Sequence, residues 1–249
     1  GKASYWLGRL HTDGIGQLEK DTQKAMNYYR KAIEQGYEEA REWMEQLQKN
    51  LVDETITDIE IPQDKSDEEL YKDAKNALEK AQFKTAYAYF SYLTQRNHAE
   101  SFNELGDMYF YGRGMAINQA KALELYKKAA ALDSVYGFFN VGFLYWNGPE
   151  EIQDPEQALQ YLKKAAQMGY TYALSFIGDI YRTGPEELID YVEAKRYYQK
   201  GVDVNEINAI KGMALLYLLG QGVTQNNAMG AFYLKKAADK GNAWAMYPL

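Results

Sequence analysis

The chain has 249 residues, of which 46% are hydrophobic and 25% charged, a balance typical of a folded protein. Lys and Arg number 28 against 35 Asp and Glu, a net charge of −7. Such a surface repels polyanions, so we expect no nucleic acid as partner. The absence of cysteine excludes disulfides, thiolate catalysis and Cys-ligated metals. The longest strongly apolar stretch, Met213 to Leu219, is far short of the roughly 20 residues of a membrane span, so no integral membrane segment is predicted.

The first segment, 1–49, shows a helical hairpin followed by part of another helix. Its small and aromatic residues recur at helical spacing, and Ala40 and Met44 begin the partial helix. The hairpin markers are Leu7-Gly8, Gly14, Gly16, Asp21, Ala25, Tyr28-Tyr29 and Lys31-Ala32. Residues 50–66 are acidic, β-branched and alternating, which indicates an irregular linker or a short strand.

Two further helices are predicted over 67–97. Leu70, Ala74 and Leu78 share one helix face, and Phe83, Ala86, Tyr89 and Leu93 follow on the next helix. This pair keeps the spacing of the other hairpins without their glycines. It therefore forms a separate hairpin between the linker and the last segment, 98–249.

The segment 98–249 repeats with a period of 36 residues. A small residue opens each unit, and a glycine follows where a neighbouring helix must approach closely. A second glycine ends the first helix, where a left-handed residue is expected. These columns are Ser101, Gly137, Ala173, Ala209 and Ala245; Gly106, Gly142, Gly178 and Ala214; Tyr109, Tyr145, Tyr181 and Tyr217; Gly112, Gly148, Gly184 and Gly220.

The second helix of each unit begins at an Asn or Asp, residues that cap free amides of the first turn. Alanine, one or two aromatics and a Lys-Ala-Ala step follow, with Lys favourably placed at the negative end of the helix dipole. The caps are Asn118, Asp154, Asp190 and Asn226, followed by Ala122, Ala158, Ala194 and Gly230.

The unit resembles the Sel1-like repeat, a relative of the tetratricopeptide repeat. The matching pattern is Ile177-Gly178-x2-Tyr181-x2-Gly184, then Ala194-x2-Tyr197-Tyr198 and Lys200. The resemblance covers roughly 1–36 and 98–249, and 67–97 is similar to a plain tetratricopeptide hairpin. It implies an all-α fold, a right-handed α/α superhelix (solenoid) of stacked hairpins. It also implies a bacterial protein; the compartment is left open between periplasm and cytoplasm, with a removed leader as one alternative.

No catalytic residue, metal site or cofactor is predicted. Gly14-x-Gly16, Gly112-x-Gly114 and Gly220-x-Gly222 lack the third glycine of a nucleotide-binding loop and follow helices, so they are interpreted as turns. The two histidines, His11 and His98, fall in a tyrosine column and at a hairpin junction, which favours structural roles. The carboxylate pairs Glu150-Glu151 and Glu186-Glu187 are interpreted as solvated loops.

One helix, that of the repeat from 136, is apolar on both faces. Gly137, Val141 and Tyr145 occupy its core stripe. If the first helices line the concave side, as the resemblance implies, the stripe beside it lies on the inner surface. The candidate partner-binding residues are Phe110, Tyr111, Tyr136, Phe139, Phe143 and Trp146, with Asp107, Asp179 and Arg182 as polar selectors. Packing of the stripe against another helix or against 50–66, and a dimer contact, are the alternatives.

The leading hypothesis is a non-enzymatic scaffold that holds a peptide or protein segment in a concave groove. Aromatic side chains would supply affinity, because they dominate interface hot spots. A hydrolase of the cell envelope is the alternative from another class, and it requires two convergent carboxyl groups. A third hypothesis makes the chain a regulatory fragment of a larger protein, because both ends cut into repeats.

Overall fold

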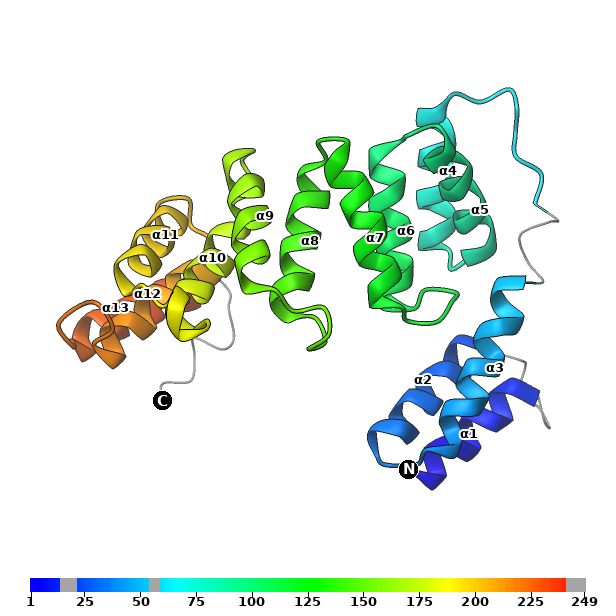
Figure 1. Cartoon of the computed structure of the whole chain (residues 1–249), viewed down its shortest axis with the longest axis horizontal. Helices are drawn as coiled ribbons and strands as arrows, with labels where there is room; N and C mark the ends of the chain where they lie inside the picture. Colours follow the sequence, from blue (N-terminus) through cyan, green and yellow to red (C-terminus); the bar gives the residue numbers. More distant parts are fainter. Residues whose placement is uncertain (14–21, 54–58, 241–249) are drawn as a thin grey trace. The chain divides into compact units, whose positions relative to one another are not determined.

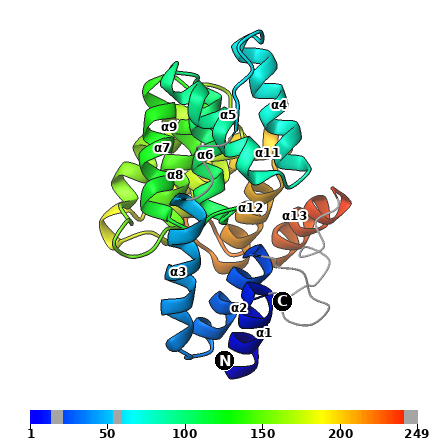
Figure 2. The same ribbon diagram turned by 90° about the vertical axis from the view of Figure 1, so that its right-hand side faces the viewer.

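The computed structural model describes residues 1–13, 22–53 and 59–240. Within these ranges the protein is all-helical, with thirteen α-helices, one short 3-10 helix at Glu186–Leu188 and no strand (Figures 1 and 2). This confirms the predicted all-α fold class.

The chain divides into two compact units, 1–132 and 133–249. The helices of the first unit are α1 (Lys2–Asp13), α2 (Thr22–Glu34), α3 (Glu39–Asp53), α4 (Asp67–Glu79), α5 (Phe83–Gln95), α6 (Ala99–Tyr111) and α7 (Gln119–Ala131). Those of the second unit are α8 (Val135–Asn147), α9 (Pro155–Gln167), α10 (Ala173–Thr183), α11 (Tyr191–Asp203), α12 (Ile207–Leu219) and α13 (Asn227–Asp239). The boundaries predicted after 49, 66 and 97 stay predictions, although α3 extends to Asp53, into the predicted linker.

Each hairpin packs a first helix on a second helix, as in α6 with α7 or α8 with α9. In the second unit, α10 also contacts α8 and α12 directly, so the first helices of that unit form a continuous layer. The cores lie between the paired helices, around Ile177 and Leu162 in one cluster and around Tyr198 and Met213 in the next.

The second helices begin where the sequence predicts. The side chain of Asn118 accepts a hydrogen bond from the Lys121 amide at 2.9 Å, and Asp154 accepts one from Gln157 at 3.0 Å. Asp190 and Asn226 cap α11 and α13 in the same way. His98 caps α6 through its ring nitrogen, which supports its structural interpretation; the side chain of His11 lies outside the described residues.

The glycine column marks the contact between the two helices of a hairpin. A Cβ at Gly106 would overlap the Tyr126 ring, and one at Gly178 would overlap the Tyr198 ring. The predicted close approach is confirmed, and the neighbour is a tyrosine ring rather than a backbone. Both tyrosines belong to the second helix of the same hairpin and are buried.

The prediction of a left-handed residue at the end of each first helix is half wrong. Gly112 and Gly220 have φ of 68° and 67°, as predicted. Gly148 and Gly184 are extended, with φ of −71° and −69°. A proline follows each of these two glycines, and a residue before proline is driven towards extended conformations.

The rings of the tyrosine column pack between the two helices of a hairpin. Tyr145 and Tyr181 are half-buried, and each ring lies against an aromatic ring of the second helix. The ring pairs are Tyr145–Tyr161, Tyr181–Tyr197 and Tyr217–Tyr233, with centroids 5.8 to 5.9 Å apart.

Candidate functional site

The inner-stripe residues of α8 meet aromatic rings of the next hairpin. Phe139 and Phe143 lie 5.5 and 5.6 Å from the Phe176 ring of α10, centroid to centroid. Phe139 also lies 4.7 Å from Tyr170, in the loop before α10. We call Tyr136, Phe139, Phe143, Tyr170, Tyr172 and Phe176 the aromatic cluster.

The aromatic cluster is partly core and partly surface. Phe139, Phe143 and Phe176 are half-buried against one another, which agrees with the packing alternative. Tyr136 and Tyr172 are each 53% exposed. Trp146 is half-buried and packs against the core between α9 and α10. The two exposed tyrosines both lie against Tyr170, with ring centroids 5.5 and 6.4 Å apart, and Tyr170 in turn contacts Phe139.

Sequence reasoning missed three members of the cluster, Tyr170, Tyr172 and Phe176. A signal existed for Tyr172, because it stands 36 residues after Tyr136 and so takes the same place in the next repeat. Tyr170 and Phe176 carry no such signal, since the corresponding positions of the preceding repeat hold Ser134 and Asn140.

The predicted polar selectors Asp107 and Asp179 are tied to buried tyrosines. The Tyr126 hydroxyl donates to Asp107 Oδ1 at 2.7 Å, and the Tyr198 hydroxyl donates to Asp179 Oδ1 at 2.6 Å. Burial raises the pKa of both aspartates above the usual range, against the opposing effect of these hydrogen bonds. Each carboxylate thus accepts the proton of a tyrosine hydroxyl whose ring is buried.

This pairing accounts for the alternation of polar and apolar residues at one position of the inner stripe, from α6 to α12. In the hairpins that begin with α6 and α10, the second helix holds Tyr126 and Tyr198. An aspartate of the first helix accepts the hydroxyl of each. In the hairpin of α8 and α9, the corresponding residue of the second helix is Leu162, which has no hydroxyl, and Phe143 of the first helix takes the place of the aspartate. In the hairpin of α12 and α13, Leu234 and Leu215 stand at the same two positions.

Arg182 lies one turn after Asp179 on α10. Its Nε donates to the Tyr198 hydroxyl at 3.2 Å, and a terminal nitrogen lies 3.7 Å from Asp179 Oδ1. The side chain of Arg182 is only 16% exposed, against 39% for Asp179. The structure thus brings Asp179 and Arg182 together around one tyrosine hydroxyl.

The candidates on α6 belong to the first unit. Phe110 and Tyr111 form an edge-to-face pair with centroids 4.8 Å apart, and Tyr111 is 54% exposed. Arg113, in the loop after α6, places its guanidinium 5.0 Å from the centre of the Tyr111 ring.

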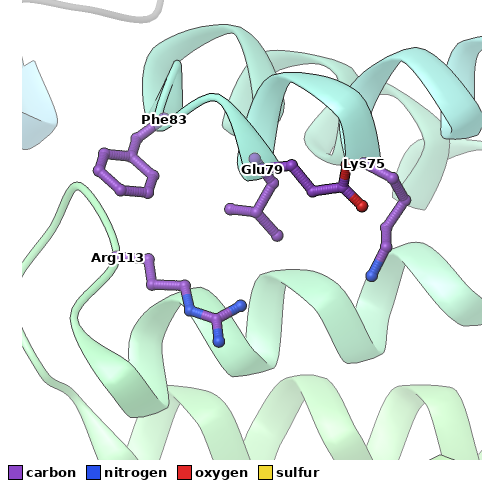
Figure 3. A pocket seen from close by; sticks show the side chains of 5 residues that line it. Lys75, Glu79, Phe83 and Arg113 are labelled. Carbon is purple, nitrogen blue, oxygen red and sulfur yellow. The ribbon is translucent and has the colours of Figure 1, made fainter.

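A hollow of about 360 Å³ lies near these residues in the first unit. It is lined by Lys75, Leu78, Glu79, Phe83 and Arg113. Figure 3 shows Lys75 and Glu79 extending from one helix, with Arg113 on the facing loop. Lys75 forms an ion pair of 2.6 Å with Glu104, so much of its charge is already compensated. Sequence reasoning did not find this hollow, because three separate segments assemble it.

No group of three or more His, Asp or Glu side chains within the described ranges is arranged to hold a metal ion. The same residues contain no helix with the length and apolarity needed to cross a bilayer.

The Sel1 repeat model matches the chain over 1–37, 99–134, 139–170, 171–204 and 207–242, well over half of its length. The chain belongs to the Sel1 repeat family. This confirms the resemblance, and the matched ranges correspond to the hairpins from α1–α2 and from α6 to α13. Sel1 repeats commonly serve as scaffolds for protein interactions. No curated protein sequence shows significant similarity to this Sel1 repeat chain.

Solved structures of Sel1 repeat proteins share the fold. A Sel1 repeat protein from Oxalobacter formigenes is 27% identical with a TM-score of 0.62, over 70% of this chain and 71% of that one. A protective antigen of uropathogenic Escherichia coli is 23% identical with a TM-score of 0.59, over 97% of this chain and 54% of that one. A putative Sel1 repeat protein from Klebsiella pneumoniae is 17% identical with a TM-score of 0.50, over 72% and 89%.

Proposed function

We propose that this Sel1 repeat protein is a non-enzymatic scaffold that binds a peptide or protein segment on the layer formed by α8, α10 and α12. The observation that carries the proposal is the aromatic cluster, in which Tyr136 and Tyr172 stay half-exposed beside Tyr170 while Phe139, Phe143 and Phe176 pack against one another. Exposed aromatic side chains on a rigid floor are typical of binding surfaces, because they contribute large contact area at a small entropic cost.

The packing of these rings between α8 and α10 supports the same proposal. Phe139 and Phe143 contact α10 through Phe176, so the rings are held before a partner arrives. A surface that is ordered in advance loses less conformational entropy on binding. Asp179 and Arg182 are the proposed polar contacts of this surface. Asp107, in the first unit, stays a separate candidate.

The hydrolase hypothesis lacks a supporting observation. It requires two carboxyl groups that converge on a substrate. Glu150 and Glu151 are exposed after α8, and Glu186 and Glu187 are exposed after α10, each pair on its own loop. The hypothesis of a regulatory fragment stays a prediction from the sequence.

The test selects peptides from a phage-displayed random 12-residue library on the whole chain and measures their affinities for variants. Tyr136→Ser with Tyr172→Ser removes the two exposed rings and leaves the phenylalanine rings of the cluster in place. We expect the selected peptides to bind this variant at least tenfold more weakly, since aromatic anchors are often worth about 2 kcal/mol or more.

The matched control is Phe232→Ser on α13, which removes a ring that is 57% exposed. The selected peptides should bind Phe232→Ser as tightly as they bind the wild type. Equal affinities for all three proteins would show that the aromatic cluster is not the binding surface. Phe143→Asp with Trp146→Ala is less suitable, because both side chains are half-buried and their loss also affects folding.

A further inference from the structure

The hollow of the first unit is lined by an arginine and a glutamate that keep their charges available, Arg113 and Glu79. Within the ranges that the structure describes, the guanidinium of Arg113 donates no hydrogen bond and pairs with no carboxylate; it lies 5.0 Å from the centre of the Tyr111 ring. In the same ranges the carboxylate of Glu79 forms no hydrogen bond or ion pair. Lys75 differs from both, because Glu104 compensates its charge. A cation and an anion thus remain for a ligand in one hollow.

A fixed loop carries Arg113. Gly112 and Gly114, on either side of it, have φ of 68° and 73°, in the left-handed region that favours glycine. The Arg113 amide donates to the carbonyl of Met108 at 2.9 Å, and a Cβ added to Gly114 would lie 2.2 Å from the Cβ of Phe83. The backbone of this loop therefore packs directly on Phe83, so the start of the Arg113 side chain is fixed against the wall of the hollow.

The corresponding loop three periods later shows what Arg113 lacks. A Cβ at Gly222 would lie 2.5 Å from the Cβ of Tyr191, which takes the place of Phe83 in that repeat. Gln221 takes the place of Arg113, and its side-chain nitrogen lies 3.5 Å from the Tyr191 hydroxyl. Phe83 has no hydroxyl, so the polar side chain of the earlier loop stays available for a ligand.

We propose that this hollow binds a short zwitterionic peptide, about the size of a dipeptide, with its carboxylate on Arg113 and its ammonium group on Glu79. Charge complementarity selects the two ends, because arginine and carboxylate groups form strong hydrogen bonds with partners of opposite charge. The inference concerns a second site and does not rest on the proposed function.

The shape of the hollow supports a ligand with two separate charged ends. Glu79 belongs to α4 and Arg113 to the facing loop, so the two charges come from different walls (Figure 3). Leu78 and Phe83 line the same hollow and are half-buried, which gives an apolar wall for a side chain. Its volume of about 360 Å³ is near the lower end of the roughly 300–1,000 Å³ that ligand sites have, which favours two residues over a long segment.

The test measures binding of four dipeptides to the whole chain by calorimetry: Ala-Leu, Ala-Phe, Leu-Ala and Phe-Ala. We expect at least one of them to bind. Acetylation of its amine and amidation of its carboxyl group should each weaken binding about tenfold, because each removes a hydrogen bond to a charged group. Gly-Gly should also bind about tenfold more weakly, because it buries no apolar side chain.

Variants assign each end of the dipeptide to its residue. Arg113→Gln should bind the dipeptide and its amide equally, and Glu79→Gln should bind the dipeptide and its acetylated form equally. The matched controls are Arg196→Gln, at an exposed arginine of α11 that pairs with Glu193, and Glu68→Gln, at an exposed glutamate of α4. Both controls should keep the full preference for the unblocked dipeptide.

The comparison of blocked and unblocked dipeptides on the wild type decides the question even if a variant does not fold. Binding of none of the four dipeptides, or equal binding of the blocked forms, would overturn the inference. A preference for the free carboxyl group alone would mean capture of a peptide C-terminus and would also overturn it, as would either preference surviving in the matching folded variant. The proposed scaffold function is tested separately, at Tyr136 and Tyr172 in the second unit.

Discussion

Residues on the two helices of a hairpin depend on one another in sets of three. Gly178 leaves the space that the Tyr198 ring fills, and Asp179 accepts the hydroxyl of that ring. The same three roles recur 72 residues earlier in Gly106, Tyr126 and Asp107. A glycine, a ring and a carboxylate therefore form one unit of packing, and a change in one alters the requirement on the others.

The raised pKa of Asp179 predicts a pH effect on stability. A carboxyl group whose pKa is higher in the folded state stabilises that state below its unfolded pKa, and this contribution is lost as the pH rises through the folded pKa. We therefore expect the free energy of unfolding of the wild type, minus that of Asp179→Asn, to be smaller at pH 7 than at pH 3. Urea unfolding of both proteins at pH 3, 5 and 7 measures the difference.

Asp107→Asn serves as the matched variant in the first unit. Burial raises the pKa of Asp107 as well, so the difference should have the same sign. A difference that is constant from pH 3 to pH 7 at both sites would contradict the assignment of burial as the dominant cause.

Whole elements begin and end at positions that local chemistry controls. The Asn and Asp caps were predictable because side-chain capping depends only on neighbouring backbone amides. The conformation of Gly148 and Gly184 was also within reach of the sequence, since Pro149 and Pro185 follow them. The 36-residue period alone led to the wrong prediction there, because it treats four loops of different composition as equivalent.

Removal of a cap tests this element-level account. Asp190→Ala should lower the free energy of unfolding by about 1 kcal/mol, because the amides of Val192 and Glu193 lose their acceptor. Asp190→Asn keeps an acceptor and should lose only a few tenths. Urea midpoints of the three proteins check both values.

Glu187→Ala removes an exposed carboxylate from the same loop and controls for charge. If it destabilises the protein as much as Asp190→Ala does, the effect comes from charge rather than capping.

The candidate site was predictable only in part. Tyr136, Phe139 and Phe143 follow from helical periodicity on one helix, and the structure places them as one stripe. The rings that meet them, Tyr170 and Phe176, come from the next hairpin. Their contact depends on how two hairpins stack, which periodicity within one helix does not describe. The burial of Asp179 likewise depends on Tyr198, a residue on another helix.

At the scale of the molecule, stability is local, because each hairpin contacts mainly its neighbours in the chain. A destabilising change should therefore loosen its own surroundings and spare distant hairpins. Gly178→Ala places a Cβ against the Tyr198 ring and should cost about 1–3 kcal/mol. Amide exchange over α10 and α11 should become roughly five- to a hundredfold faster, with no change over residues 67–131.

Hydrogen exchange followed by mass spectrometry resolves these segments. Thr171→Ala, at an exposed position just before α10, is the control and should leave exchange unaltered. Uniform acceleration along the whole chain would mean that the two units unfold together, contrary to the nearest-neighbour account.

The pairing of a surface residue with a buried one has a consequence for engineering. The residue at positions 107, 143, 179 and 215 is polar where the corresponding residue of the second helix is tyrosine and apolar where that residue is leucine. To graft a new recognition pattern onto this array, a designer must exchange both members together, or transplant a complete hairpin. A phenylalanine installed at 179 alone would leave the proton of the Tyr198 hydroxyl without its Asp179 acceptor, so the choice of residue on the first helix depends on its partner on the second.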